Sequence, residues 1–379
     1  MRKAGIAVSI ILLILMLAAI AGFFYYGAEL YEAAEASPEP TAAPSPTPSP
    51  SPTPEPSPEP TPEPQPEFYV ISMVGDCTLA GSQHIRGSAI SFEGVVGDDF
   101  AYPFAKTVQY FEDDYLSLAN LEGVLTDYDV SNGATFTFRS SPKYAQVLTS
   151  GGIDAVVLGN NHSGDYGEQG RRDTETALEA HGLVAVPDGE WRIYEGDGPK
   201  VGIYSKLYPT VQNVRDGTAA LKEAGAEIIV MALHWGLEGS YQVTADQTAV
   251  GHAAIDEGAD IVYGCHPHVL QRIEVYDGKY IFYSLGNWSF GGNTSPRDRD
   301  TAIARVTVMR APDGALSLSG YECIPCELSG TPNVNDYQPH PYEEGSEEYA
   351  RAVSKLDGSF SGPDLTIDYS AFHKNESES

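Results

Sequence analysis

Between residues 68 and 285 the sequence repeats one pattern: a short apolar run rich in strand-forming residues, a glycine or polar loop, and then usually a helical stretch. Strands that alternate with helices in this way are typical of an α/β fold. We therefore expect one large α/β domain over residues 67–332. The predicted strands are 68–74, 115–119, 154–158, 201–204, 227–233, 260–263 and 280–285.

Helices are predicted between the strands, where capping residues and glycines mark their ends. Ser140 or Ser141 can cap a helix with Pro142 in its first turn. The acidic segment 333–379 is loosely patterned, and its tail after Phe372 is expected to be disordered. The other predicted elements are helices at 173–180, 217–224, 246–257 and 347–356 and a hairpin of strands 302–309 and 315–323.

Residues 4–28 form an uncharged, mostly apolar run that follows Arg2 and Lys3. One helix of this length can cross a bilayer with a hydrocarbon core of roughly 30 Å. The basic residues before it would keep the N-terminus in the cytoplasm. We predict a cytoplasmic stub and single-pass membrane anchor over residues 1–36, with the folded domain outside the cell. A cleavable signal peptide that ends near residues 34–36 is the alternative.

Proline is nearly every second residue of segment 37–66, and Ser, Thr and Glu make up most of the rest. This composition cannot form a core and predicts an extended polyproline-II linker. At about 3.1 Å per residue, the linker could reach on the order of 90 Å. Such a tether would hold the domain away from the membrane, for instance within a thick wall of the Gram-positive type.

The formal net charge of −31 argues against a nucleic-acid-binding surface, which needs clustered Lys and Arg. It also means that an anionic substrate would need a local cation, such as a metal ion. The four cysteines are too few for a disulfide scaffold. Outside the cell Cys323 and Cys326 could form a bridge, whereas Cys77 and Cys265 could be small buried residues or a second bridge.

A polar or metal-ligating side chain follows each of six predicted strands. In open α/β sheets, ligands bind beyond the carboxyl ends of the strands, so these side chains should meet. Carboxylates together with imidazoles suit Zn, Mn, Fe or similar divalent ions. Ordinary turn and cap chemistry is the alternative explanation. The side chains are those of Asp76, Glu122, Asn161, His162, His234, His266, His268 and Asn287.

The segment 264–271, GCHPHVLQ, carries two of these histidines one residue apart. In an extended segment, alternate side chains point to one face, so both rings could reach one centre. A neutral imidazole is the commonest protein metal ligand. We predict a metal site organised around this segment.

Six motifs, in order, resemble those of the CapA family of capsule or poly-γ-glutamate synthesis proteins, whose fold is similar to that of calcineurin-like metallophosphatases. The resemblance covers about residues 68–328. It implies a metallophosphatase β-sandwich flanked by helices. The motifs are GD-x-x-L (75–79), NLEG (120–123), GNNH (159–162), HWG-x-E (234–238), G-x-HPHVLQ (264–271) and YSLGN (283–287).

The resemblance also implies metal ligands. Glu122 stands where the superfamily has an aspartate that bridges two metal ions. The remaining ligands divide into one group of Asn161, His234 and His266 and a second group of Asp76 and His268.

Two catalytic residues follow from the same resemblance, His162 and Asp76. His162 would contact the substrate phosphoryl group or act as an acid, with a simple bond to a neighbouring loop as the alternative. The superfamily has Asp-x-His after its first strand, whereas this chain has Asp76-Cys77-Thr78. A site with one ion is therefore as consistent with the sequence as a site with two.

Asn287 and Arg139 are the predicted substrate contacts. The guanidinium of Arg139 could hold a carboxylate through two hydrogen bonds. A surface ion pair for Arg139 and a scaffold role for Asn287 are the alternatives.

The sequence thus predicts a membrane-anchored, extracytoplasmic CapA-like protein that works with capsule or poly-γ-glutamate synthesis and export proteins. The expected activity is that of a metal-dependent hydrolase or transferase of the phosphoesterase type. One alternative is a non-catalytic scaffold that binds an anionic polymer in the export complex. Another is a hydrolase of cell-wall polymers.

Overall fold

The structure of the chain is a computed structural model, and it describes residues 64–366. The predicted anchor (1–36), nearly all of the predicted linker (37–66) and the tail beyond residue 366 lie outside the described residues. Within residues 64–366, no helix is both long and apolar enough to cross a membrane.

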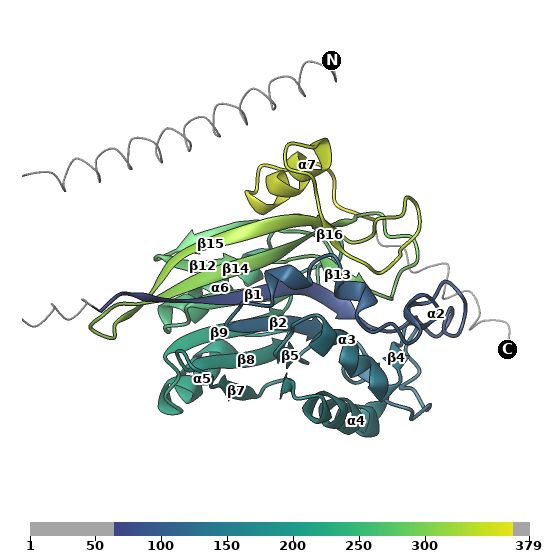
Figure 1. Ribbon diagram of the computed structural model, residues 1–379, viewed down its shortest axis with the longest axis horizontal. Coiled ribbons are helices and arrows are strands. Elements are labelled where there is room, and N and C mark those ends of the chain that lie inside the picture. Colours follow the sequence, from purple (N-terminus) through teal and green to yellow (C-terminus); the bar gives the residue numbers. More distant parts are fainter. Residues whose placement is uncertain (1–63, 367–379) are drawn as a thin grey trace, which may run out of the picture. The chain divides into compact units, whose positions relative to one another are not determined.

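Two β-sheets form the centre of the domain (Figure 1). The eight-stranded sheet has the order β16-β15-β14-β1-β2-β5-β6, and β13 also pairs with β1. The six-stranded sheet has the order β11-β12-β10-β9-β8-β7. The first sheet consists of β1 (Glu67–Thr78), β2 (Leu116–Leu121), β5 (Ala155–Val157), β6 (Val184–Val186), β13 (Asn287–Phe290), β14 (Asp300–Arg310), β15 (Leu316–Glu327) and β16 (His340–Pro341). The second consists of β7 (Trp191–Tyr194), β8 (Val201–Leu207), β9 (Ile228–His234), β10 (Ile261–Cys265), β11 (Ile273–Tyr276) and β12 (Lys279–Phe282). A small separate sheet pairs β3 (Val124–Leu125) with β4 (Arg139–Ser140).

The two large sheets pack face to face around one apolar core. Strand β9 shows how the sequence builds this arrangement, because successive side chains of a strand point to opposite faces. Val230 and Ala232 lie in the core between the sheets, whereas Ile229 and Met231 face the helices outside. Burial on both faces explains why the central strands are nearly continuous apolar runs.

Helices cover the outer faces of both sheets, which gives four layers in the order α/β/β/α. This arrangement confirms the predicted α/β fold. The outer face of the eight-stranded sheet is covered by α2 (Phe92–Val96), α3 (Ala145–Ser150) and α4 (Gly167–Ala180), and that of the six-stranded sheet by α5 (Val211–Glu223) and α6 (Ala245–Asp256).

Two helices begin earlier than the sequence predicts. Helix α5 begins at Val211 after a capping box made by Thr210 and Asn213, not at Gly217. Gly217 lies inside the helix, where an added Cβ would come within 2.8 Å of the Tyr204 ring. Helix α4 likewise begins at residue 167 rather than 173. Gly217 thus serves close helix–sheet packing and does not mark a helix end.

The prediction of a single strand at 280–285 is wrong in its extent. Strand β12 ends at Phe282, and after Gly286, which has a φ of 70°, the chain enters β13 of the other sheet. Strand β13 runs parallel to β1 and pairs Asn287 with Asp76. The YSLGN motif is therefore the point at which the chain crosses from one sheet to the other.

The helix predicted from Ser141 is also shorter than expected. A 3₁₀ turn occupies Pro142–Tyr144 before α3, and the Ser141 side chain donates or accepts no cap hydrogen bond.

All four cysteines lie among the described residues, and none of them is bridged. Cys323 and Cys326 are three residues apart on β15, so their side chains point to opposite faces of the sheet. The possible Cys323–Cys326 bridge is therefore not formed, and Cys77 and Cys265 are buried free thiols.

Residues 333–366 pack into the same compact unit as the sheets. Helix α7 (Glu347–Leu356) rests on β14 and β15, as the sequence predicts for 347–356. Its Lys355 is 4% exposed, and its Nζ lies 2.7 Å from an oxygen of Asp298 and 2.7 Å from an oxygen of Asp300. Arg351 adds two hydrogen bonds to Asp300, of 2.9 and 2.6 Å. Buried ion pairs thus fasten α7 to the loop before β14.

Replacement of Lys355 by Ala should cost about 3–5 kcal/mol of unfolding free energy, because it leaves two buried carboxylates without this partner. Urea unfolding followed by circular dichroism measures the change. Lys143→Ala is the control, since Lys143 pairs with Asp98 on the exposed surface, and it should cost less than about 1 kcal/mol. Equal losses in the two variants would contradict the role given to the buried pairs.

Candidate metal centre

The predicted site residues meet where the carboxyl ends of parallel strands from both sheets converge. The eight-stranded sheet contributes side chains at the end of β1, just after β2 and after β5. The six-stranded sheet contributes side chains at the end of β9 and in the loop after β10. In the same order, these side chains are Asp76, Glu122, Asn161 with His162, His234, and His266 with His268.

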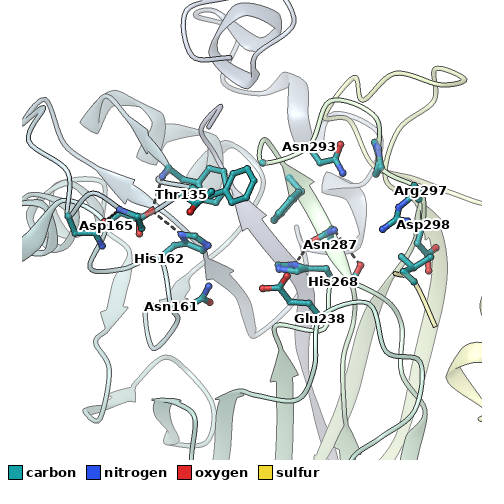
Figure 2. A pocket seen from close by; sticks show the side chains of 18 residues that line it. Thr135, Asn161, His162, Asp165, Glu238, His268, Asn287, Asn293, Arg297 and Asp298 are labelled. Carbon is teal, nitrogen blue, oxygen red and sulfur yellow. Dashed lines mark hydrogen bonds and ion pairs between the residues drawn. The ribbon is translucent and has the colours of Figure 1, made fainter. Parts of the chain in front are cut away.

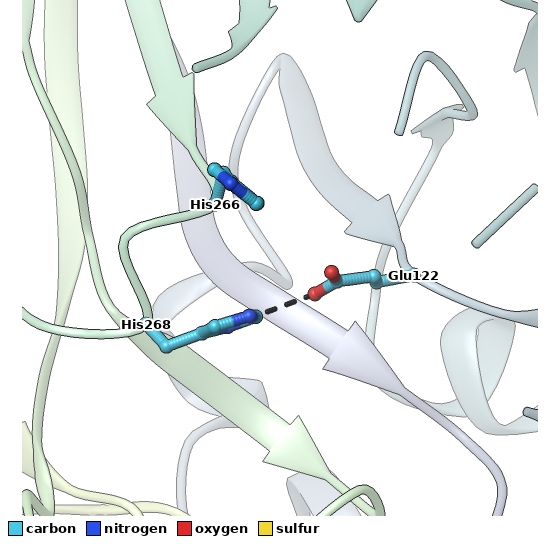
Figure 3. Close-up of side chains that lie close together, drawn as sticks. All are labelled: Glu122, His266 and His268. Carbon is cyan, nitrogen blue, oxygen red and sulfur yellow. Dashed lines mark ion pairs between the residues drawn. The ribbon is translucent and has the colours of Figure 1, made fainter. Parts of the chain in front are cut away.

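Glu122 lies in the middle of the site, fully buried. Its Oε1 is 3.7 Å from Nε2 of His234. Its Oε2 is 3.8 Å from Nδ1 of His268 (Figure 3). Neither oxygen has a hydrogen-bond partner within the described part of the chain. Burial raises the pKa of Glu122 to about 7. A carboxylate placed in this way needs a cation close by.

The two histidines of GCHPHVLQ converge by a different route from the predicted one. The segment is not extended at these residues, because His266 has a φ of 99° and His268 a φ of 57°. Residues other than glycine rarely adopt such backbone angles, and backbone strain of this kind is typical of functional sites. The ring centroids are 5.9 Å apart, and ligand atoms of Glu122, His266 and His268 all lie within 4.8 Å of one another.

Asp76 holds this strained loop in place. One of its oxygens accepts a hydrogen bond of 3.1 Å from the backbone N–H of His266 and lies 3.3 Å from Nδ1 of His268. The other accepts a bond of 2.8 Å from Asn120, whose own oxygen accepts one of 3.0 Å from Asn160. Sequence reasoning missed both asparagines as site residues, although they belong to the NLEG and GNNH motifs.

His234 and Asn161 form the other side of the site. Nε2 of His234 lies 2.6 Å from Oδ1 of Asn161. Burial lowers the pKa of His234 well below its usual range, and burial lowers that of His266 to about 4. Both imidazoles are therefore neutral, which is the form that binds metals. The buried Nδ1 of His266 has no hydrogen-bond partner among residues 64–366.

In contrast to His234 and His266, His268 is favoured in its protonated, positively charged form. Burial alone would lower its pKa, but the carboxylates of Glu122 and Asp76 raise it to about 10. A positive charge is thus favoured between these two acids. Burial would raise the pKa of Asp76, but its contacts with His268 and other site histidines lower it to about 2.

These groups fit a divalent cation. Carboxylate and neutral imidazole donors are the set that Zn, Mn and Fe prefer. The partnerless atoms of Glu122 and His266 supply donors that nothing else in residues 64–366 uses. One oxygen of Glu122 faces His234 and the other faces His268, so the same carboxylate could serve one ion or bridge two.

A cavity of about 580 Å³ opens beside the centre (Figure 2). His162 lines it, and its Nδ1 lies 2.9 Å from Oδ2 of Asp165, which also accepts a bond of 2.8 Å from the Phe138 N–H. Glu238 lines the cavity too, close to His268 in Figure 2. Sequence reasoning did not assign Glu238 a role, although it is the last residue of the HWG-x-E motif.

The two predicted substrate contacts differ in their position. Asn287 lines the cavity, and its Oδ1 lies 2.9 Å from Nδ1 of His268. Arg139 is not among the residues that line this cavity, and its guanidinium lies 5.4 Å from the centre of the Tyr166 ring. The neighbouring Phe138 faces the cavity instead, because consecutive side chains of a strand point to opposite sides.

Comparison with known proteins identifies the family. The profile described as "Bacterial capsule synthesis protein PGA_cap" matches residues 70–190 and 194–291, which is more than half of the chain. The chain belongs to this capsule synthesis protein family. This membership confirms the resemblance to the CapA family, and the matched ranges include every residue of the candidate metal centre.

Curated relatives carry corresponding names. The chain is 25% identical over 278 residues to the capsule biosynthesis protein CapA of Bacillus anthracis, covering 63% of this chain and 64% of the relative. It is 30% identical over 207 residues to the PGA biosynthesis protein CapA of Bacillus subtilis, covering 48% of this chain and 54% of the relative. The chain thus spans less than two thirds of the length of these two capsule synthesis proteins.

Among solved structures, the chain overlaps with the NAD nucleotidase of Haemophilus influenzae at a TM-score of 0.38 and 12% identity, covering 78% of this chain and 63% of the other. It overlaps with a purple acid phosphatase from yellow lupin at a TM-score of 0.35 and 12% identity, covering 68% and 54%.

Addition of Mn²⁺ or Zn²⁺ should stabilise the metal-free protein, because an ion that binds only the folded state shifts the unfolding equilibrium. The gain is about 2.7 kcal/mol at 100 times the dissociation constant. Glu122→Gln should abolish this gain. Thermal unfolding and metal analysis after dialysis measure the two effects.

His252→Ala is the matched control, because His252 forms a histidine–carboxylate pair with Glu274 outside the site and should keep the full gain. Stabilisation that survives in Glu122→Gln would contradict the assignment. Metal analysis of the wild type and of His266→Ala also counts the ions. If the wild type binds one ion per chain and the variant none, the site holds a single ion. If the wild type binds two and the variant one, the site holds a bridged pair.

Proposed function

We propose that this chain is a metal-dependent phosphoesterase, of the calcineurin-like metallophosphatase type, that acts in the synthesis of a bacterial capsule or poly-γ-glutamate polymer. The observation that carries this proposal is the buried Glu122 carboxylate, which has no chain partner and lies with His266 and His268 beside a cavity. Family membership and the names of the relatives support the polymer pathway.

The metal would be held by Glu122, His266 and His268, with His234, Asn161 and Asp76 beside them. His268 would have to release the proton that its raised pKa favours, because only a neutral imidazole binds a metal ion. A divalent ion bound there would polarise the electrophilic centre of the substrate and offset its negative charge. This charge compensation matters in a chain with a formal net charge of −31, which otherwise repels anionic substrates.

His162 is the candidate general acid. Its Nδ1 faces Asp165, which leaves Nε2 as the ring nitrogen that can meet a substrate in the cavity. Burial alone would lower the pKa of His162, but the hydrogen bond with Asp165 and the charge of Glu122 raise it. The raised pKa favours the protonated ring, which would donate its proton to the leaving-group oxygen. Asp165 is a positioning residue, since it orients the ring and favours the protonated form.

The cavity wall next to His162 is aromatic. Phe138 lies 4.6 Å from the His162 ring between centroids, and Phe136 and Phe290 line the same cavity. Apolar walls exclude water and strengthen the electrostatic interactions of a bound substrate.

The proposed location is the outer side of the cell membrane. The apolar run at 4–28 would anchor the chain, and the proline-rich segment 37–66 would hold the domain away from the bilayer. Other proteins of capsule or poly-γ-glutamate synthesis and export would be its partners there.

A second candidate function is a non-catalytic scaffold that holds an anionic polymer at the metal centre. One observation favours it: Thr78 stands where the superfamily has a ligating histidine, and both oxygens of Asp76 already contact groups of the chain. The activity of the metal-loaded protein separates the two functions.

His162→Ala should lower kcat on a phosphodiester with an alcohol leaving group by about 10²- to 10⁴-fold, because that leaving group loses its proton donor. Asp165→Asn should cause a smaller loss, about 10-fold, since the ring remains but is less well held. Both variants should keep the metal content of the wild type.

His181→Ala is the control, because His181 bonds to a backbone carbonyl at the end of α4 and should retain full activity. A His162→Ala protein with the wild-type rate would refute the acid role. A metal-loaded wild type without turnover on phosphomonoesters and phosphodiesters would refute the phosphoesterase proposal and favour the scaffold.

A further inference from the structure

One wall of the cavity is built by residues beyond those that match the family profile. The profile match ends at residue 291. Asn293, Pro296, Arg297, Asp298 and Leu365 line the cavity after that point. Figure 2 shows Arg297 and Asp298 on one side of the cavity and His162 on the other. This wall is therefore particular to the C-terminal part of the chain.

Arg297 brings a positive charge to this wall of the cavity. Among the described residues that line the cavity, it is the only Lys or Arg. Its Nη2 donates a hydrogen bond of 2.5 Å to the carbonyl oxygen of Thr366. Within residues 64–366, no carboxylate lies within ion-pair distance of its guanidinium.

The adjacent acid, Asp298, already forms an ion pair with Lys355 on the side away from the cavity. Its Oδ2 lies 2.7 Å from Nζ of the buried Lys355 and accepts a hydrogen bond of 2.8 Å from the Tyr241 hydroxyl. The charge of Asp298 is thus directed towards α7. The charge of Arg297 remains available to the cavity.

Residues 360–366, which we call the C-terminal strap, hold Arg297 in this position. Asp364 accepts hydrogen bonds from the Ser240 hydroxyl at 2.9 Å and from the Tyr241 N–H at 2.8 Å. The Leu365 N–H donates a bond of 2.9 Å to the Gly239 carbonyl. The strap is therefore fixed to the loop after β9, and its Thr366 carbonyl braces the guanidinium.

We propose that Arg297 forms an anion subsite of the cavity, which takes a carboxylate or phosphate group of the substrate on the side away from His162. A guanidinium can hold either group through two parallel hydrogen bonds. Pro296 and Leu365 line the same wall beside Arg297. The inference deepens the proposed function, since it assigns the non-reacting part of the substrate in the same cavity.

The test is calorimetric binding of two probes, tri-γ-glutamate and tripolyphosphate, to the full chain freed of metal by dialysis. Arg297→Gln should weaken binding about 10-fold, the usual worth of a charged hydrogen bond. Arg297→Lys should give an intermediate loss, because it keeps the charge but not the planar fork. Asp364→Ala should also weaken binding, by less, because it loosens the strap.

Arg215→Gln is the matched control. Arg215 lies on the exposed surface of α5, where it pairs with Glu257, and the change likewise removes one positive charge. It should stay within about twofold of the wild type. A loss in Arg297→Gln confined to tri-γ-glutamate assigns the subsite to carboxylates, and one confined to tripolyphosphate assigns it to phosphates. Binding of both probes by Arg297→Gln as tight as by Arg215→Gln would overturn the proposal.

The catalytic readout is separate. In the metal-loaded protein, Arg297→Gln should raise KM for a substrate with a distant anionic group and leave kcat unchanged, because the subsite does not touch the reacting atoms. The binding test needs neither metal nor turnover. Its failure therefore leaves the proposed function standing, and a catalytically inactive protein leaves the subsite standing.

Discussion

The buried carboxylate of Glu122 is the interaction on which the rest of the site depends. Both of its oxygens are removed from water, and neither meets a hydrogen-bond donor in residues 64–366. A buried charge without compensation costs several kcal/mol. A cluster of imidazoles surrounds Glu122, and the carboxylates of Glu122 and Asp76 raise the pKa of His268 to about 10, which favours a positive charge there until a metal ion binds. A bound divalent ion would meet the same need more strongly.

The position of Glu122 also explains why the domain needs two sheets. Glu122 and Asp76 come from the eight-stranded sheet, whereas His234 and His266 come from the six-stranded one. The loop after β10 reaches across only with positive φ angles, each of which costs of order 1–3 kcal/mol. The hydrogen bond from the His266 N–H to Asp76 ties this loop to the other sheet. The hydrogen bond thus stabilises the strained backbone at His266 itself.

The C-terminal part of the chain completes the cavity beside this centre. Helix α7 is fastened through buried Lys355, and the strap follows it to the loop after β9. As a result, a metal centre built within the family-matched ranges opens onto a wall built outside them.

The sequence alone determined the α/β alternation, the family and the set of side chains at the strand ends, because these depend on local periodicity and short motifs. It did not show that Asp76 braces a loop while Glu122 stays without a partner. It also did not show that Arg139 faces Tyr166 or that Arg297 faces the cavity. These points depend on the side to which each side chain points and on contacts between residues far apart in the chain. Only the packing of the two sheets and the strap decided them.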